Sequence, residues 1–177
     1  MTKVTVNLGS INARGLIDAK YSKPGTALGC PRLTALDHRL KTLYDAITNN
    51  SDPRHEAAIR IEKRLNEQFV MEMQNLYELE AALAALVNPD DVIQLDIEAQ
   101  TTPVDVALRQ PISFSGLRLV AQYDKLILLI DFLYKTNQLC VQQAHVVARK
   151  MREKAGKPVR RFMTQVSKEL AAAELSS

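Results

Sequence analysis

Apolar residues follow a helical spacing over the longest patterned stretch of the chain, residues 52–88. The apolar positions at intervals of three and four are Ile61, Leu65, Phe69, Met73, Leu76, Leu79, Leu83 and Leu86. This spacing places them on one side of an α-helix. Asp52 is a good N-cap, Pro53 suits the first helical position, and Asn88 ends the helix because it precedes a proline. At about 1.5 Å per residue this helix is roughly 50 Å long, which is longer than a domain of this size usually contains. We therefore expect it to be the spine of the fold, with part of its apolar stripe facing a partner chain.

The first fifty residues predict a strand followed by two helices. The predicted elements are a strand at 3–8, a helix at 10–21, a loop at 22–31 and a second helix at 32–48. The strand alternates strictly, with Val4, Val6 and Leu8 on one face. Ser10 is the expected N-cap of the first helix. The strand must pair with another strand, because a single strand is not stable by itself.

After the spine, the pattern predicts two further strands and a helical C-terminal part. The predicted elements are strands at 92–98 and 103–109, and helices at 115–136, 141–154 and 159–174. The two strands are expected to form a hairpin, and the first of these helices is apolar all round and so should be central to the core. We expect an α+β fold, mostly α. Its strand-helix-helix segment (1–48) and its helical and β-hairpin support region (52–177) should form one continuous globular unit.

The composition, 46% hydrophobic and 24% charged residues, is ordinary for a soluble globular protein. No apolar run approaches the roughly 18 residues of a membrane span, and the start MTKVTVNLGS does not resemble a signal peptide. We therefore expect a cytoplasmic protein without a membrane partner. The three histidines and two cysteines show no metal-ligand spacing, and there is no Gly-rich phosphate loop or nucleophile with an obvious base. These features predict a protein that is not an enzyme and uses no metal or cofactor.

The net charge of +3 conceals an uneven distribution. Residues 1–50 carry seven Lys and Arg against three Asp and Glu, residues 51–114 five against twelve, and residues 115–177 eleven against five, so the balances of +4, −7 and +6 sum to +3. Basic ends indicate an anionic partner. Seven cations lie among residues 149–161 with one acid, Glu153. This run is typical either of a solvated helix end or of contacts with a phosphate backbone.

The outward face of the N-terminal strand suits the reading of DNA bases. A two-stranded ribbon fits the major groove, where its outward side chains meet base edges. Such a face needs a cation, amide donors or small hydroxyls and no carboxylate, and Lys3, Thr5 and Asn7 meet that demand. The same order of elements recurs at 103–109, 115–136 and 141–154, but there Asp105 lies on the strand's polar face. Alternation by itself is also common in an ordinary edge strand of a sheet.

Several segments spread along the chain resemble a known family. They are VTVNLGSINARGLIDAK, LGCPRLTAL, the RIEKRL of the spine, and FSGLRLVAQYDKLILLIDFLYKTNQL followed by ARKMREKAGKPVRRF. Together they cover most of the chain in order and resemble the AcaB-type family of integrating conjugative elements and large conjugative plasmids. The resemblance implies a role in conjugative transfer. The AcaB-like members imply a ribbon-helix-helix DNA-binding activator of transfer-gene transcription.

We therefore predict a homodimer that binds double-stranded DNA as a sequence-specific transcriptional regulator, acting as an activator. The first strands of two chains would form an antiparallel ribbon in the major groove. Bases would be read by Lys3, Thr5 and Asn7, and phosphates held by Lys23, Arg32, Arg149, Lys157, Arg160 and Arg161. The rest of the chain would build the dimer and a surface for another protein such as RNA polymerase. The alternative is a structural or adaptor protein of the conjugative element without DNA binding, in which residues 3–8 join the predicted hairpin as a third strand.

Overall fold

The computed structural model describes residues 2–22, 29–88, 101–139 and 141–175. Its elements are β1 (Thr2–Leu8), α1 (Ile11–Ile17), the 3₁₀ turn η1 (Ala19–Tyr21), α2 (Leu33–Thr48), α3 (His55–Ala84), β2 (Thr102–Leu108), α4 (Pro111–Lys135), the 3₁₀ turn η4 (Val141–Gln143) and α5 (Ala144–Leu175). The described chain is mostly helical with one two-stranded antiparallel sheet, which confirms the expected α+β class. None of its described helices is long and apolar enough to span a membrane.

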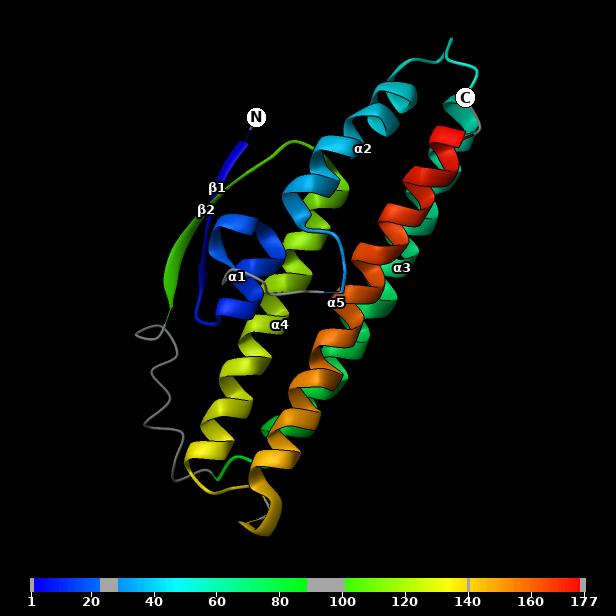
Figure 1. Cartoon of the computed structure of the whole chain (residues 1–177). Coiled ribbons are helices and arrows are strands. Elements are labelled where there is room, and N and C mark those ends of the chain that lie inside the picture. The colour runs from blue at the N-terminus through cyan, green and yellow to red at the C-terminus, as the bar shows by residue number, and fades with distance from the viewer. Residues whose placement is uncertain (1, 23–28, 89–100, 140, 176–177) are drawn as a thin grey trace.

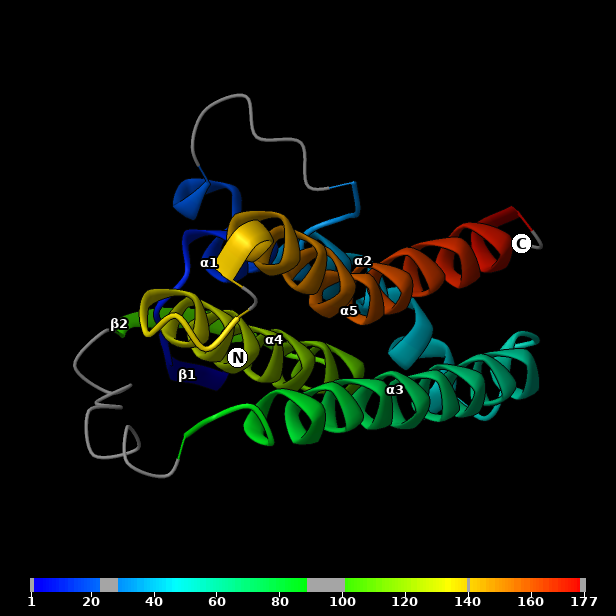
Figure 2. The same ribbon diagram turned by 90° about the horizontal axis from the view of Figure 1, so that it is seen from below.

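Three long helices, α3, α4 and α5, lie side by side and form the body of the molecule (Figure 1). Helix α4 is central: it contacts α1, α2, α3, α5 and β1, and twelve of its 25 residues are buried. This confirms the expectation drawn from its all-round apolar sequence, because only a helix packed on most sides can bury residues around its circumference. The β1–β2 ribbon lies along one side of α4, and α5 lies along another (Figure 2).

The spine helix is shorter than the spacing predicted, at both ends. Its buried stripe is the expected one, from Ile61 to Leu83, but Leu86 is exposed. The helix begins at His55 rather than Pro53, because the Asp52 carboxylate is held by Arg54, whose backbone N–H donates to Oδ1 at 2.8 Å and whose Nη2 donates to Oδ2 at 2.9 Å. Asp52 therefore shapes the turn before the helix and does not act as its N-cap.

The N-terminal strand pairs with a strand far along its own chain. β1 runs antiparallel to β2 with Thr5 opposite Asp105 and Val4 opposite Val106. The predicted strand 103–109 is thus confirmed to within a residue, but the partner the structure gives it is β1. The predicted hairpin strand 92–98 lies outside the described residues. A pairing across about a hundred residues cannot be read from local alternation, because every alternating strand offers the same pattern.

The C-terminal part is one helix where two were predicted. Proline breaks helices because it has no backbone N–H to donate to the carbonyl of residue i−4 and because its ring clashes with that carbonyl, yet Pro158 lies inside α5. Its neighbours Ala155 and Val159 are fully buried, and the Arg160 guanidinium donates to the carbonyl of Glu153, five residues before the proline, at 3.3 Å. Burial of the apolar side chains on both sides of Pro158 therefore outweighs the lost backbone hydrogen bond.

Candidate nucleic-acid interface

The polar positions of β1, Lys3, Thr5 and Asn7, are exposed, as the alternation predicted. The residues opposite them in β2 on the same face are Ala107, Asp105 and Pro103. The Thr5 hydroxyl donates a hydrogen bond to Asp105 Oδ1 at 2.8 Å. The face that would meet base edges therefore carries a carboxylate beside its central residue. Asp105 repels phosphates and acceptor-rich base edges, so the single-chain ribbon is a poorer reading face than β1 by itself.

Buried carboxylates anchor the end of each strand of the ribbon. At the end of β1, the Asp124 carboxylate of α4 accepts hydrogen bonds from the backbone N–H groups of Gly9 and Ser10, each at 2.7 Å. At the end of β2, Asp37 of α2 accepts from the N–H groups of Arg109 and Gln110 at 3.0 and 3.1 Å. Both carboxylates are buried. Charge-assisted hydrogen bonds of this kind are stronger than neutral ones, so the ribbon is held rigidly against the bundle.

The β1 side of the ribbon is less well covered than the β2 side. On the inner face, Val104 and Val106 of β2 are buried, while Val4 and Val6 of β1 are only half-buried. Within the described residues β1 pairs with β2 alone, so its second edge is open. An open edge beside half-covered apolar side chains is a typical site for the addition of another strand.

The start of α2 brings two of the predicted phosphate ligands together. Arg32 is the N-cap residue of α2 and makes no side-chain capping bond, so the first amides of the helix have no side-chain partner there. Arg160 of α5 lies against the same loop: its Cδ would be 3.9 Å from a Cβ at Gly29, which has a φ of +69°. Burial raises the pKa of the Cys30 thiol, and the adjacent Arg160 and Arg32 partly oppose this rise.

The cations of α5 divide into paired and free groups. Arg161 donates to Glu72 of α3 at 2.7 Å and Arg152 to Asp131 of α4 at 2.6 Å, so both tie helices together. Arg149 makes only a long surface pair with Glu153, at 3.8 Å. Within the basic run 149–161, the exposed lysines without an ion pair among the described residues are Lys150, Lys154 and Lys157.

These lysines form one stripe along α5, because residues separated by four and three positions share a helix face. Lys150 and Lys154 belong to the basic run 149–161, but of these three lysines the sequence-based assignment of phosphate ligands named only Lys157. Arg161, in contrast, was predicted to bind phosphate. The structure places it beside the buried carboxylate of Glu72, where it joins α5 to α3.

The predicted DNA-binding residues do not form one surface. Helix α4 lies between the β1–β2 ribbon and α5 in both views (Figures 1 and 2). Lys3, Thr5 and Asn7 are therefore separated from Arg149 and Lys157. Lys23 lies outside the described residues. The structure thus brings Arg32 and Arg160 together and leaves the ribbon and the lysine stripe as distinct surfaces.

The fold is that of a helical bundle with a clamped two-stranded ribbon, and it is similar to a known structure. No protein-family model matches the sequence, and no curated protein sequence matches it. The chain is similar to selenomethionine-containing AcaB from uropathogenic E. coli, with a TM-score of 0.63 and 12% sequence identity over 99% of this chain and 83% of that chain. At this identity the likeness establishes the fold alone. It supports a structural relation to AcaB, in line with the resemblance of the sequence segments.

Proposed function

We propose that this protein is a homodimeric, sequence-specific DNA-binding regulator of conjugative transfer genes, acting as an activator. The observation that carries the proposal is the clamped ribbon, whose β1 strand exposes a cation, a hydroxyl and an amide at Lys3, Thr5 and Asn7. Groups that read base edges must be preorganised, and the carboxylates of Asp124 and Asp37 supply that rigidity. The AcaB-like fold and the resemblance of the sequence segments support the same function.

In the proposed dimer, the open edge of β1 pairs with β1 of a second copy. The two β1 strands then form the centre of a four-stranded sheet, and β2 of each chain lies outside them. This arrangement covers the half-buried Val4 and Val6 and moves Asp105 away from the centre of the reading face. It modifies the sequence-based expectation, in which β1 had no partner within its own chain.

Phosphate contacts follow from the same arrangement. Arg32, Arg160 and the uncapped first amides of α2 form a proposed phosphate site. Arg149 and Lys157 lie on the far side of α4, so they contact DNA beyond the segment that the ribbon reads. The remaining surface is left for a protein partner such as RNA polymerase, which an activator contacts.

The first test separates base reading from backbone attraction. Replacing Asn7 with Ala removes donor and acceptor groups worth about 1–3 kcal/mol at a base edge, so affinity for the element's own promoter fragment should fall about tenfold or more. Affinity for a random duplex should stay nearly constant. Asn66→Ala, at an exposed position of α3, is the matched control and should change neither affinity in a gel-shift titration. Equal promoter affinity for Asn7→Ala and wild type would contradict base reading by β1.

Lysine substitutions on α5 should behave differently in the same titration. Replacing Lys157 with Ala should weaken promoter and random-duplex binding together, because a phosphate contact is independent of sequence. It should also reduce the slope of log affinity against log salt by about one. An unchanged salt slope would remove α5 from the interface.

The second test concerns the dimer. Light scattering should give about twice the 19.8 kDa chain mass, since β1 pairs with β2 alone in the part of the chain that the structure describes. Val4→Lys places a charge on the inner face beside that edge and should yield the monomer mass. Val70→Lys, a control on the exposed face of α3, should remain dimeric. A monomeric wild type, or a dimer broken by Val70→Lys and not by Val4→Lys, would exclude the strand-paired dimer.

One observation favours a second candidate, an adaptor protein of the conjugative element without DNA binding. β1 is already paired within its own chain, and Asp105 binds the hydroxyl of Thr5. These two contacts are what an ordinary edge strand of a sheet makes, and neither of them implies DNA binding. The gel-shift titration distinguishes the two, because an adaptor shows no preference between promoter and random duplex.

A further inference from the structure

A pocket of about 540 Å³ opens at the end of the bundle, where α2 and α5 end and α3 begins. In Figure 1 these helix ends meet near the C-terminus, away from the β1–β2 ribbon. The floor of the pocket is apolar, and its residues Leu43, Ile61 and Leu170 are buried. Its walls hold small residues from all three helices, Ala46, Ala57, Ala58, Ala172 and Ala173. An apolar hollow of roughly 300–1,000 Å³ with a few polar groups is typical of a small-molecule site.

The rim of the pocket is rich in arginine. It carries Arg39, Arg54, Arg60 and Arg64, against Glu169 as the one acidic residue of the lining. Arg64 holds Glu169 with two hydrogen bonds, at 3.2 and 2.6 Å, and these lower the pKa of the Glu169 carboxyl. Glu169 therefore stays ionised and occupies Arg64. Of the other guanidinium groups, Arg54 pairs with Asp52 and Arg60 with Glu56, two acids outside the lining of the pocket.

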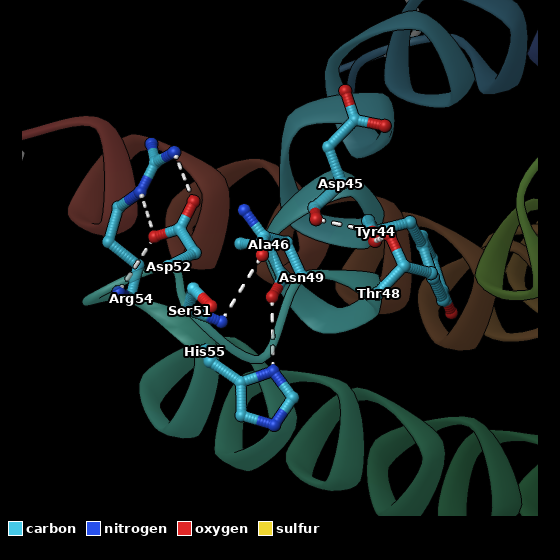
Figure 3. A network of polar contacts seen from close by, with 9 residues as sticks. All are labelled: Tyr44, Asp45, Ala46, Thr48, Asn49, Ser51, Asp52, Arg54 and His55. Atoms are coloured by element: carbon cyan, nitrogen blue, oxygen red, sulfur yellow. Dashed lines mark hydrogen bonds and ion pairs between the residues drawn. The ribbon is translucent and has the colours of Figure 1, made fainter.

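One wall of the pocket is locked by the α2–α3 turn (Figure 3). The His55 ring donates from Nδ1 to the carbonyl of Ala46 at 3.1 Å, which joins the start of α3 to the end of α2. Arg54 binds Asp52 through its guanidinium and its backbone N–H, and these bonds lower the pKa of Asp52 to about 2. Ser51 N–H also donates to Asn49 Oδ1, at 3.2 Å. This side of the pocket is thus preformed, which reduces the entropic cost of binding.

Arg60 is the rim cation that a ligand can recruit at least cost. Its pair with Glu56 has a long N···O distance of 3.5 Å, and the two side chains are 64% and 84% exposed. A surface pair of this kind contributes little to stability. A guanidinium can exchange such a partner for a ligand carboxylate and form two parallel hydrogen bonds with it.

We propose that this pocket binds a small amphipathic anion, a carboxylate carried on an apolar chain, with its charged end on Arg60 and its chain over Leu43, Ile61 and Leu170. The chain removes the apolar floor from water, and the carboxylate replaces Glu56 as the partner of Arg60. The site is separate from the ribbon and from the lysines of α5, and the proposal does not depend on DNA binding.

The charge requirement is tested with decanoate as the probe, titrated into the full chain by calorimetry. We expect one saturable site, and an affinity about tenfold lower for decanol, which has the same chain without the charge. Arg60→Gln should lower the decanoate affinity about tenfold. Arg149→Gln is the matched control, because Arg149 also makes an exposed i,i+4 pair with a glutamate, and it should leave the affinity unchanged.

The apolar requirement is tested by filling the pocket. Ala57→Leu adds bulk to an exposed lining position of α3 and should abolish saturation, whereas Ala81→Leu, an exposed position outside the lining of the pocket, should not. Leucine and glutamine are good helix formers, and unfolding curves confirm that each variant folds. Absence of saturable decanoate binding, equal affinity for decanol, or unchanged affinity in both Arg60→Gln and Ala57→Leu overturns the proposal.

Discussion

Replacing Arg161 with Ala should lower the free energy of unfolding by about 3 kcal/mol, the low end of the range for leaving a buried charge without its partner, because the Arg161 side chain is itself 56% exposed. The partner, Glu72, is 0% exposed on α3, so the substitution leaves a carboxylate inside the α3–α5 seam without its cation. Gln68 and Asn75 still donate to Glu72, at 2.7 and 3.0 Å, which keeps the loss at this lower end. Urea-induced unfolding followed by circular dichroism measures the difference.

Two further variants test the cause of this loss. Arg64→Ala removes a cation from the same seam, but its partner Glu169 retains some contact with water, so the loss should be nearer 1 kcal/mol. Adding Glu72→Gln to Arg161→Ala should restore most of the stability, because the uncompensated charge is gone. The explanation fails if Arg161→Ala costs no more than Arg64→Ala.

The expected loss of stability in Arg161→Ala affects the choice of variants for measuring DNA binding. A loss of DNA affinity in Arg161→Ala would combine a lost phosphate contact with a weakened seam. Lys157 is the better probe of α5, because it is exposed and has no ion pair among the described residues.

Replacing Asp124 with Ala should cost about 2–4 kcal/mol and loosen the N-terminal strand. The carboxylate is buried on α4 and satisfies the N–H groups of Gly9 and Ser10 together. Their loss leaves two partly buried donors without an acceptor, and each such donor costs about 1–3 kcal/mol. Asp124→Asn retains one acceptor oxygen and should lose about half as much. Hydrogen exchange of the Gly9 and Ser10 amides, together with urea unfolding, measures both effects.

Asp131→Ala on the same helix is the control for this experiment. Its carboxylate pairs with Arg152 at 2.6 Å but is partly exposed, so the expected loss is below about 1 kcal/mol. If Asp124→Ala folds with unchanged exchange at Gly9 and Ser10, the carboxylate does not anchor the ribbon. In the proposed function, a loosened ribbon should also lose promoter affinity more than random-duplex affinity, because only base reading needs a fixed geometry.

Local pattern was enough to predict most of the helices. The stripe from Ile61 to Leu83 and the all-round apolar segment of α4 follow from hydrophobic periodicity, which depends on residues a few positions apart. Ser10 was predicted as the N-cap of α1, and its hydroxyl accepts from the Ala13 N–H at 3.1 Å. The helix ends sooner than expected, at Ile17. The next residue, Asp18, is extended and accepts from the Lys20 N–H.

The candidate site was predictable only in part. The exposure of Lys3, Thr5 and Asn7 follows from strand alternation, which is local. The carboxylate of Asp105 beside Thr5 does not, because it arrives through a strand pairing across about a hundred residues. No local signal separates Arg161, which binds a buried glutamate, from Lys157, which faces solvent.

The sequence by itself thus determined most of the helices, the strands β1 and β2, and which of their faces are apolar, because these properties depend on spacing along one element. Only the tertiary structure decided that β1 pairs with β2, that α5 continues through Pro158, and that Asp124 and Asp37 hold the ribbon. Each of these depends on burial between distant elements. Packing outweighs a missing backbone hydrogen bond, and a buried carboxylate acquires its role from donors that the fold brings to it.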